Sequence, residues 1–376
     1  MGPGPHSDEL LGRRAIQLSQ TGRVPFGIYL HVPFCASRCD YCAFATWTDR
    51  HHLIDDYLDA CRRQAATVAA DCPPVTSVFV GGGTPSQVPP DALLAILAEL
   101  PLEAGVEITV ECNPDDVTAA FVGGLAAGGV NRVSMGVQSM VPSVLRSLGR
   151  THDPAHVSAA VKTARAAGIA DLNLDLIYGA AGESPDDWTT TLDAVLALGP
   201  DHVSAYGLTV EPGTPLWDDP SRHPDDDDQA DKYVLADDQL AASGLESYEV
   251  SNWARPGHEC RHNLLYWRQQ DYIGLGCAAH SHVDGRRWWS VRTPERFIAA
   301  IADGASPEAG SERLDPPGRR LEALQLALRT SDGVPADAVP EEVAHLVDVR
   351  GGRARLTRDG RLLANEVAVR LRVEGG

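Results

Sequence analysis

Three closely spaced cysteines are the residues of this chain most suited to chemistry. Cys35, Cys39 and Cys42 follow one another with the spacing C-x3-C-x2-C. Three thiolates from one short loop can bind three irons of a four-iron cluster and leave the fourth iron without a protein ligand. An iron with an open position can bind and activate a second molecule, which a four-cysteine electron-transfer site does not offer. The spacing therefore predicts a reactive [4Fe-4S] site.

Two other uses of these cysteines remain alternatives. A structural zinc site is closed and four-coordinate, so it needs a fourth ligand. His31, Cys61 or Cys72 could supply it, but none of them completes a familiar pairing of C-x2-C units. A disulfide framework fits poorly, because the N-terminus lacks an apolar leader and the chain is therefore expected in a reducing compartment.

Composition narrows the class of protein. The chain has 376 residues, of which 43% are hydrophobic, which suits one large domain and a small one. Its formal net charge of -20 argues against a general nucleic-acid binder or a binder of anionic membranes, since both need a basic face. No apolar run approaches the ~20 residues that span a bilayer, so we predict a cytoplasmic protein without a membrane span.

Short apolar runs alternate with helical patterns in the first half of the chain. Strands are predicted at 27–31, 75–80, 106–111, 132–136, 172–176 and 202–208, with helices near 54–70, 91–100, 118–127, 154–167 and 185–198. This alternation is typical of a parallel sheet wound in βα units. A full eight-unit barrel needs ~250 residues, so six units predict an α/β fold with a partial (β/α)6 barrel that is open on one side.

The second half of the chain has a different pattern. A helix is predicted at 226–243, a strand at 246–250 and a helix at 294–302, followed by a Gly/Pro linker at 305–318. Helices near 319–329 and 340–347, with a small hairpin within 353–369, indicate a winged-helix-like C-terminal module. We therefore divide the chain into an N-terminal segment (1–24), the barrel (25–250), a connecting region (251–304) and the C-terminal module (305–376).

Polar residues follow several of the predicted strands. The active site of a parallel α/β barrel lies at the carboxyl ends of its strands, and the cysteine loop follows the first of them. A Gly-Gly-Gly-Thr-Pro-Ser segment follows the second strand and is either a tight turn or a backbone that approaches a ligand. It is not a nucleotide P-loop, because the Gly-Lys-Ser/Thr ending is missing. Further polar residues at strand ends, which together predict a polar organic ligand, are Glu111, Gln138 and Asp175.

The order of these blocks resembles the coproporphyrinogen-oxidase-like branch of the radical S-adenosylmethionine (SAM) proteins. The resemblance extends over nearly the whole chain and is more specific than any single motif. It rests on the blocks at residues 29–35, 39–42, 81–86, 111–114, 136–139, 148–150 and 175–179.

The resemblance implies cofactors and roles. Cys35, Cys39 and Cys42 would ligate the [4Fe-4S] cluster, whose open iron would chelate the amino and carboxylate groups of SAM. Reductive cleavage of SAM would yield methionine and a 5'-deoxyadenosyl radical, from which the barrel must exclude water and oxygen. The other implied positions are Gly82, Gly83 and Thr84 at the methionine part, Glu111, Gln138, Arg150 and Asp175 at its polar groups or ribose, and Tyr29 and Tyr41 near the cluster and adenine.

Two functions compete within this branch. The oxygen-independent coproporphyrinogen III oxidases usually carry a further cysteine two residues after the triad and a longer N-terminal extension. This chain has Phe44 at that position and reaches its first predicted strand by Gly27. Both departures favour a related family of haem chaperones, which lacks the extra cysteine. Relatives that transfer methyl groups or open haem are a third option, and a zinc-dependent DNA-binding protein is disfavoured by the charge and the barrel pattern.

The haem-chaperone family also carries an HNxxYW motif associated with haem binding. The chain has His262, Asn263, Tyr266 and Trp267 in this pattern. Imidazole is a suitable axial ligand for haem iron, and the aromatic rings can pack against a macrocycle. The alternatives are a satisfied loop histidine with core aromatics, or Cys260 as the iron ligand. We therefore predict a haem chaperone that serves a haem-requiring acceptor, with a respiratory protein as one candidate, and keep the oxidase as the alternative.

Overall fold

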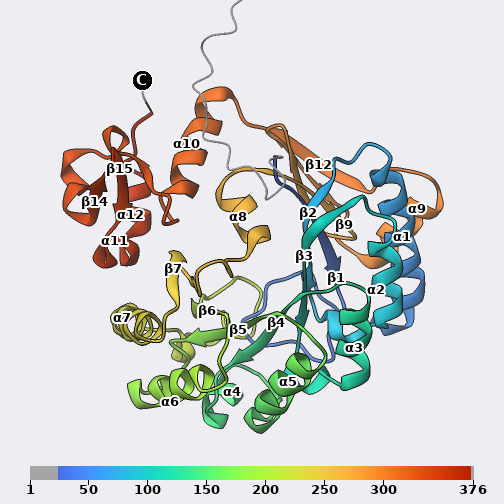
Figure 1. Cartoon of the computed structure of the whole chain (residues 1–376), viewed down its shortest axis with the longest axis horizontal. Helices are drawn as coiled ribbons and strands as arrows, with labels where there is room; N and C mark the ends of the chain where they lie inside the picture. The colour runs from blue at the N-terminus through green and yellow to red at the C-terminus, as the bar shows by residue number, and fades with distance from the viewer. Residues whose placement is uncertain (1–23, 374–376) are drawn as a thin grey trace, which may run out of the picture.

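A computed structural model describes residues 24–373 and contains a twelve-stranded sheet (Figure 1). Its six central strands run parallel and lie in chain order. The predicted partial (β/α)6 barrel is therefore confirmed. The predicted N-terminal segment lies outside the described residues except for Val24. The six strands are β1 (Phe26–Val32), β2 (Val75–Gly82), β3 (Leu102–Cys112), β4 (Arg132–Gln138), β5 (Asp171–Tyr178) and β6 (His202–Gly207).

Helices cover the outer face of these strands (Figure 1). Several helices begin where a side chain caps free backbone N–H groups, as Ser184 does for Asp187 in a capping box. Thr118 caps another helix by accepting from Phe121 N. The helices are α1 (Ile54–Ala69), α2 (Pro90–Leu97), α3 (Ala119–Ala127), α5 (Pro154–Ala166) and α6 (Pro185–Leu196), together with the short α4 (Pro142–Ser147), which the sequence pattern did not predict.

The sheet extends beyond the six parallel strands at both edges. At one edge β8 (Asn252–Ala254) pairs antiparallel with β6, and β7 (Glu246–Glu249) pairs with β8. At the other edge β9 (Asp271–Leu275) pairs parallel with β1. The antiparallel β10 (His280–Val283), β11 (Arg286–Ser290) and β12 (Glu308–Arg313) follow β9. The prediction of a linker over 305–318 was therefore wrong, because β12 lies within it and pairs with β11.

A short helix stands inside the open barrel. Helix α8 (Arg261–Trp267) carries the HNxxYW motif and lies against β1 and β2 (Figure 1). The close approach depends on Gly27, because a Cβ there would clash with Leu265 and lie 3.0 Å from His262 Cε1. The fold thus brings the motif to the interior of the barrel.

The C-terminal region has a small core of its own, which includes Leu328, Val334 and Val367. After α7 (Asp226–Ala242) and α9 (Pro294–Ala302), it contains α10 (Pro316–Ala327), β13 (Val334–Pro335), β14 (Val347–Arg350), β15 (Arg353–Leu356), α11 (Arg358–Leu362) and α12 (Ala364–Ala368). The hairpin is β14–β15 and precedes the last two helices, so the prediction of strand structure after residue 357 was wrong. The stretch predicted as a helix at 340–347 is a 3-10 helix over Glu341–Leu346. The domain boundaries stay a prediction.

Candidate functional site

The three cysteines lie together in the loop between β1 and α1. All three are free thiols and partly buried. The hydroxyl of Thr84 donates to Cys35 Sγ at 3.4 Å, and Arg150 Nη1 donates to Cys39 Sγ at 3.4 Å. Burial raises the pKa of the Cys35 and Cys42 thiols. Residues that follow β2 and β4 therefore hold the cysteine loop at the mouth of the barrel.

The geometry of the loop can be compared with that of a single zinc site. Zn–S bonds of about 2.3 Å in a tetrahedron place sulfur atoms about 3.8 Å apart. Among residues 24–373, these cysteines belong to no set of three whose ligand atoms lie within 4.8 Å of one another. Moreover, both ring nitrogens of His31 are engaged, Nδ1 with Tyr29 OH at 3.1 Å and Nε2 with Ala45 O at 2.9 Å. A zinc ion would therefore have to displace one of these partners before His31 could bind it as the fourth ligand.

The glycine-rich segment after β2 packs against the backbone of β1 and the cysteine loop. Gly83 N donates to Val32 O at 2.7 Å, and Thr84 N donates to Phe34 O at 2.8 Å. A Cβ at Gly83 would lie 2.7 Å from Val32 O, and Gly82 has a φ of +109°. Both glycines are thus required by backbone packing, and their contact with the methionine part of SAM stays a prediction.

Arg150 links the cysteine loop to the ends of two strands. Its Nη2 donates to Asn113 Oδ1 and to Gly136 O, each at 2.9 Å. Tyr41 is partly buried near it, and desolvation, together with the Cys39 charge, raises the pKa of Tyr41. Gln138 is buried at the end of β4 and has a φ of +63°, which is uncommon for a residue with a side chain. Arg150, Tyr41 and Gln138 therefore surround the mouth of the barrel.

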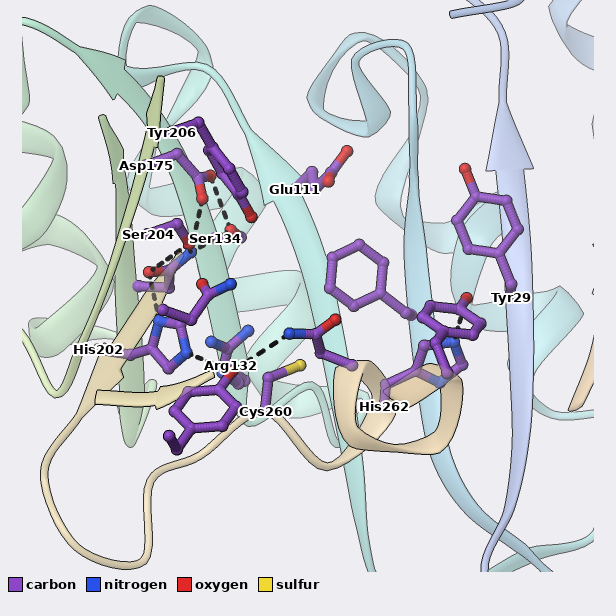
Figure 2. Close-up of a pocket in the computed structure, with 16 residues that line it drawn as sticks. Tyr29, Glu111, Arg132, Ser134, Asp175, His202, Ser204, Tyr206, Cys260 and His262 are labelled. Carbon is purple, nitrogen blue, oxygen red and sulfur yellow. Dashed lines mark hydrogen bonds between the residues drawn. The ribbon is translucent and has the colours of Figure 1, made fainter. Parts of the chain in front are cut away.

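A cavity of about 150 Å³ lies deeper in the barrel (Figure 2). Six residues predicted for SAM or haem line it, together with Cys260. Trp267, Tyr41, Gln138 and Arg150 are not among its lining residues. The lining residues are Tyr29, Phe79, Glu111, Arg132, Ser134, Asn173, Asp175, His202, Ser204, Tyr206, Tyr248, Asn252, Cys260, His262, Asn263 and Tyr266.

Two carboxyl groups of the cavity differ in how they are held. Glu111 is partly buried, and desolvation of its carboxyl group, with a smaller effect from the Asp175 charge, raises its pKa to about 8. Its Oε2 accepts from Gly82 N at 3.1 Å. Asp175 accepts from Ser134 Oγ at 2.8 Å and from Asn173 Nδ2 at 2.7 Å. Burial still raises the pKa of Asp175. The sequence analysis placed Asp175 at the end of its strand. That prediction was wrong, because β5 continues to Tyr178 and Asp175 lies within it.

His262 is a buried, hydrogen-bonded helix residue with an exposed fraction of 1%. Its Nδ1 lies 3.0 Å from Ser77 Oγ and its Nε2 lies 2.8 Å from Tyr266 OH. Burial lowers its pKa to about 3, so the imidazole is neutral at pH 7. Neutral imidazole is the form that ligates iron, but a metal must displace one of the two hydroxyl partners. Trp267 is partly buried, and its Nε1 has no partner among residues 24–373.

Sequence reasoning missed most of the polar residues on the strands that line the cavity. They occur at every second position, because alternate side chains of a strand point to the same face. The sequence therefore did contain a pattern that could have revealed them, namely polar residues at alternate positions in three neighbouring strands. The residues concerned are Arg132 and Ser134 on β4, Asn173 on β5, and His202, Ser204 and Tyr206 on β6.

Comparison with known proteins identifies the family. The radical SAM superfamily matches residues 29–195, which contain the cysteine loop, Glu111 and Asp175. The curated haem chaperone HemW of Mycobacterium tuberculosis is 42% identical over 365 residues, covering 91% of this chain and 94% of that protein. The chain belongs to the HemW family. HemW of Escherichia coli is 38% identical over 73% of the chain and 76% of its own length, and HemW of Bacillus subtilis is 29% identical over 90% and 97%.

A solved structure shows that the HemW family shares its fold with an oxidase. Coproporphyrinogen III oxidase (HemN) from Escherichia coli, described as a radical SAM enzyme, superposes with a TM-score of 0.81. The alignment covers 92% of this chain and 89% of the oxidase, at 24% sequence identity. This similarity supports the partial barrel and the C-terminal module, and at this identity it supports the fold alone.

Proposed function

We propose that this chain is a haem chaperone, which binds haem and transfers it to a haem-requiring acceptor protein. The observation that carries the proposal is the similarity to curated HemW proteins over nearly the whole chain. The position of the HNxxYW motif supports it, because His262, Asn263 and Tyr266 line the cavity of the barrel whose mouth carries the cysteine loop.

The chain offers a suitable set of ligands for a [4Fe-4S] cluster and SAM. Cys35, Cys39 and Cys42 would hold the cluster, which when reduced supplies the electron that cleaves the sulfonium of SAM. We assign the remaining contacts of SAM as the family resemblance implies. They are Gly82, Gly83 and Thr84 at the methionine part, Glu111, Gln138, Arg150 and Asp175 at its polar groups or ribose, and Tyr29 and Tyr41 near the cluster and adenine.

The raised pKa of Glu111 decides what this residue can do at pH 7. With a pKa of about 8, the carboxyl group is mostly protonated. One of its oxygens accepts from Gly82 N, and the protonated group can donate to a ligand oxygen such as a ribose hydroxyl. Asp175 already accepts from Ser134 and Asn173, which fixes its orientation. Glu111 is thus the adaptable carboxyl group of the site, and Asp175 is the fixed one.

Haem binding is assigned to His262, Asn263, Tyr266 and Trp267, with His262 as the iron ligand. Coordination through Nε2 requires Tyr266 to release its hydrogen bond to that nitrogen. Cys260 is the weaker candidate, because burial, only partly offset by the charge of Arg132, raises the pKa of its thiol to about 12. A thiol must lose its proton before it binds iron well.

Substitution of His262 tests the haem site. In His262→Ala, we expect titration with haem to give no Soret band of a histidine-ligated haem. His345→Ala is the matched control, because His345 is exposed in the C-terminal module. Full haem binding by His262→Ala would contradict the assignment of this residue.

The location and the acceptor are also part of the proposal. No helix within residues 24–373 is long and apolar enough to cross a membrane. We propose a cytoplasmic protein that meets its acceptor there, with a respiratory haem protein as one candidate. Pull-down of acceptors with haem-loaded and haem-free chain tests this, since a haem-delivery contact should depend on the loading.

The oxidase is the second candidate function. The shared fold is compatible with it, whereas Phe44, which is 69% exposed beside the cysteine loop, stands where these oxidases usually carry a cysteine. An anaerobic assay of the cluster-loaded chain with coproporphyrinogen III, SAM and a reductant separates the two functions. We expect no product, and formation of protoporphyrinogen IX would overturn the chaperone proposal.

A further inference from the structure

Arg132 is a buried cation without an ion pair among the described residues. It begins β4, lines the cavity and is 2% exposed. Among residues 24–373, its Nε has no hydrogen-bond partner. By contrast Lys232, which is equally buried, donates to Asp228 at 2.7 Å and lies 3.2 Å from a carboxylate oxygen of Glu183. The chain therefore pairs one buried cation fully and leaves another facing a cavity (Figure 2).

The acidic neighbours of Arg132 are engaged with other groups. Glu107 accepts from Arg261 N and His262 N, each at 3.0 Å, at the start of α8. Asp175 accepts from Ser134 and Asn173. Both carboxylates act on Arg132 through charge, without a hydrogen bond to it. They help to keep the guanidinium protonated but leave its Nε without a hydrogen-bond partner among residues 24–373.

Cys260 does not neutralise Arg132 either. The two side chains lie close together in the cavity wall (Figure 2). Because burial raises the pKa of the Cys260 thiol to about 12, it remains neutral at pH 7. A buried guanidinium without a hydrogen-bonded anion is unfavourable in a low-dielectric interior. A ligand that brings its own anion would remove this penalty.

We propose that Arg132 forms a carboxylate-binding subsite in the barrel. The planar guanidinium presents a fork of donors that matches a carboxylate. Typical ligand pockets measure ~300–1,000 Å³, whereas this cavity of about 150 Å³ suits a carboxylate arm and not a whole macrocycle. Release of Tyr266 from His262, which iron coordination already requires, would open the cavity on the side of α8.

The proposed haem ligand itself contains a carboxylate that could bind Arg132. Haem carries two propionate arms, and one of them is the carboxylate that we assign to Arg132. This identification rests on the proposed function, whereas the carboxylate subsite itself rests on the geometry of Arg132. The subsite makes a prediction that iron ligation by His262 does not make: binding should depend on the free acid form of the propionates.

Esterified haem tests the assignment. We expect the unmodified chain to bind haem about ten- to a hundredfold more tightly than haem dimethyl ester, as loss of a charge-assisted hydrogen bond predicts. Arg132→Met should bind haem only as tightly as the unmodified chain binds the ester. Its affinity for the ester itself should equal that of the unmodified chain. Arg292→Met, at an exposed position outside the cavity, should keep the full preference. An unchanged preference for the free acid in Arg132→Met would overturn the subsite.

A second measurement on the unmodified chain does not require haem binding or a folded variant. Propionate should raise the melting temperature more than propionamide, its uncharged analogue, at equal concentration and ionic strength. Equal effects of the two probes would overturn the subsite. Failure of the chain to bind any haem, with propionate still stabilising it, would overturn the proposed function and leave the carboxylate subsite supported.

Discussion

The cysteine loop and the cavity of the barrel are built in opposite ways. The loop takes its three thiols from eight consecutive residues, is partly exposed and is held from outside by Thr84 and Arg150. The cavity draws its lining from residues between positions 29 and 266, on separate strands and on α8. The loop is therefore a local feature, whereas the cavity exists only in the folded chain.

The two regions also differ in the hydrogen bonding of their polar groups. In the loop, burial raises the pKa of the Cys35 and Cys42 thiols, and Thr84 and Arg150 donate to Cys35 and Cys39. In the cavity most polar groups already pair with one another, as His262 does with Ser77 and Tyr266. Arg132 differs from them, because its Nε has no hydrogen-bond partner among the described residues. A ligand entering the cavity must therefore break existing hydrogen bonds at His262, but none at the Nε of Arg132.

Removal of one loop thiol should have the largest effect. Cys39→Ala leaves two of the three proposed ligands and also removes the sulfur that Arg150 contacts. We expect anaerobically reconstituted protein to lose most of its roughly four irons per chain. Iron and sulfide analysis measures this. Cys72→Ala is the control outside the loop, and a matching loss of iron there would show that Cys72 is a fourth ligand and contradict the open iron.

The cavity predicts a smaller effect that depends on pH. Folding raises the pKa of Glu111 from 4.5 to about 8, so between these values the folded chain holds a proton that the unfolded chain has lost. This contribution to stability is complete below about pH 4.5 and is lost as the pH rises to about 8. In this range, Glu111 should lower the unfolding free energy of the unmodified chain by up to about 1.4 kcal/mol for each pH unit. We expect Glu111→Gln to lack this contribution, so that its unfolding free energy falls less steeply with pH.

Urea unfolding of cluster-free protein across this pH range measures the difference between Glu111→Gln and the unmodified chain. Histidines titrate in the same range, but they are present in both proteins and cancel in the comparison. Parallel pH profiles for the two proteins would show that Glu111 ionises as an ordinary carboxyl group, and the cavity would then be wetter than its burial indicates.

The hydrogen bond between Tyr266 and His262 predicts the smallest effect. Tyr266→Phe keeps the ring and removes the hydroxyl that occupies His262 Nε2. A net hydrogen bond contributes about 1 kcal/mol, so we expect haem affinity through His262 to rise by roughly fivefold. Titration followed at the Soret band measures it. Tyr272→Phe is the control, since Tyr272 packs against Tyr266 at 4.7 Å between ring centroids but has no bond to His262. Weaker haem binding in Tyr266→Phe would contradict the idea that the Tyr266 hydroxyl and haem iron compete for His262 Nε2.

Local patterns were sufficient for the parallel strands and most of their helices. Strand period, helix caps and glycine stops are properties of neighbouring residues, so they can be read without the fold. The strands β9 to β12 were missed because they are short and depend on pairing with β1 and with one another. Their residues also lack a clear alternation, since pairing across long sequence distances and not local preference decides their structure.

By itself, the sequence determined the cysteine spacing, the six βα units and the HNxxYW motif, because each of these depends on residues that are close in the chain. Only the tertiary structure decided that α8 enters the barrel, that His262 is already hydrogen-bonded on both nitrogens, and that Arg132 Nε has no partner among the described residues. The physical reason is that burial and pairing depend on side chains more than a hundred residues apart, as Ser77 and His262 illustrate.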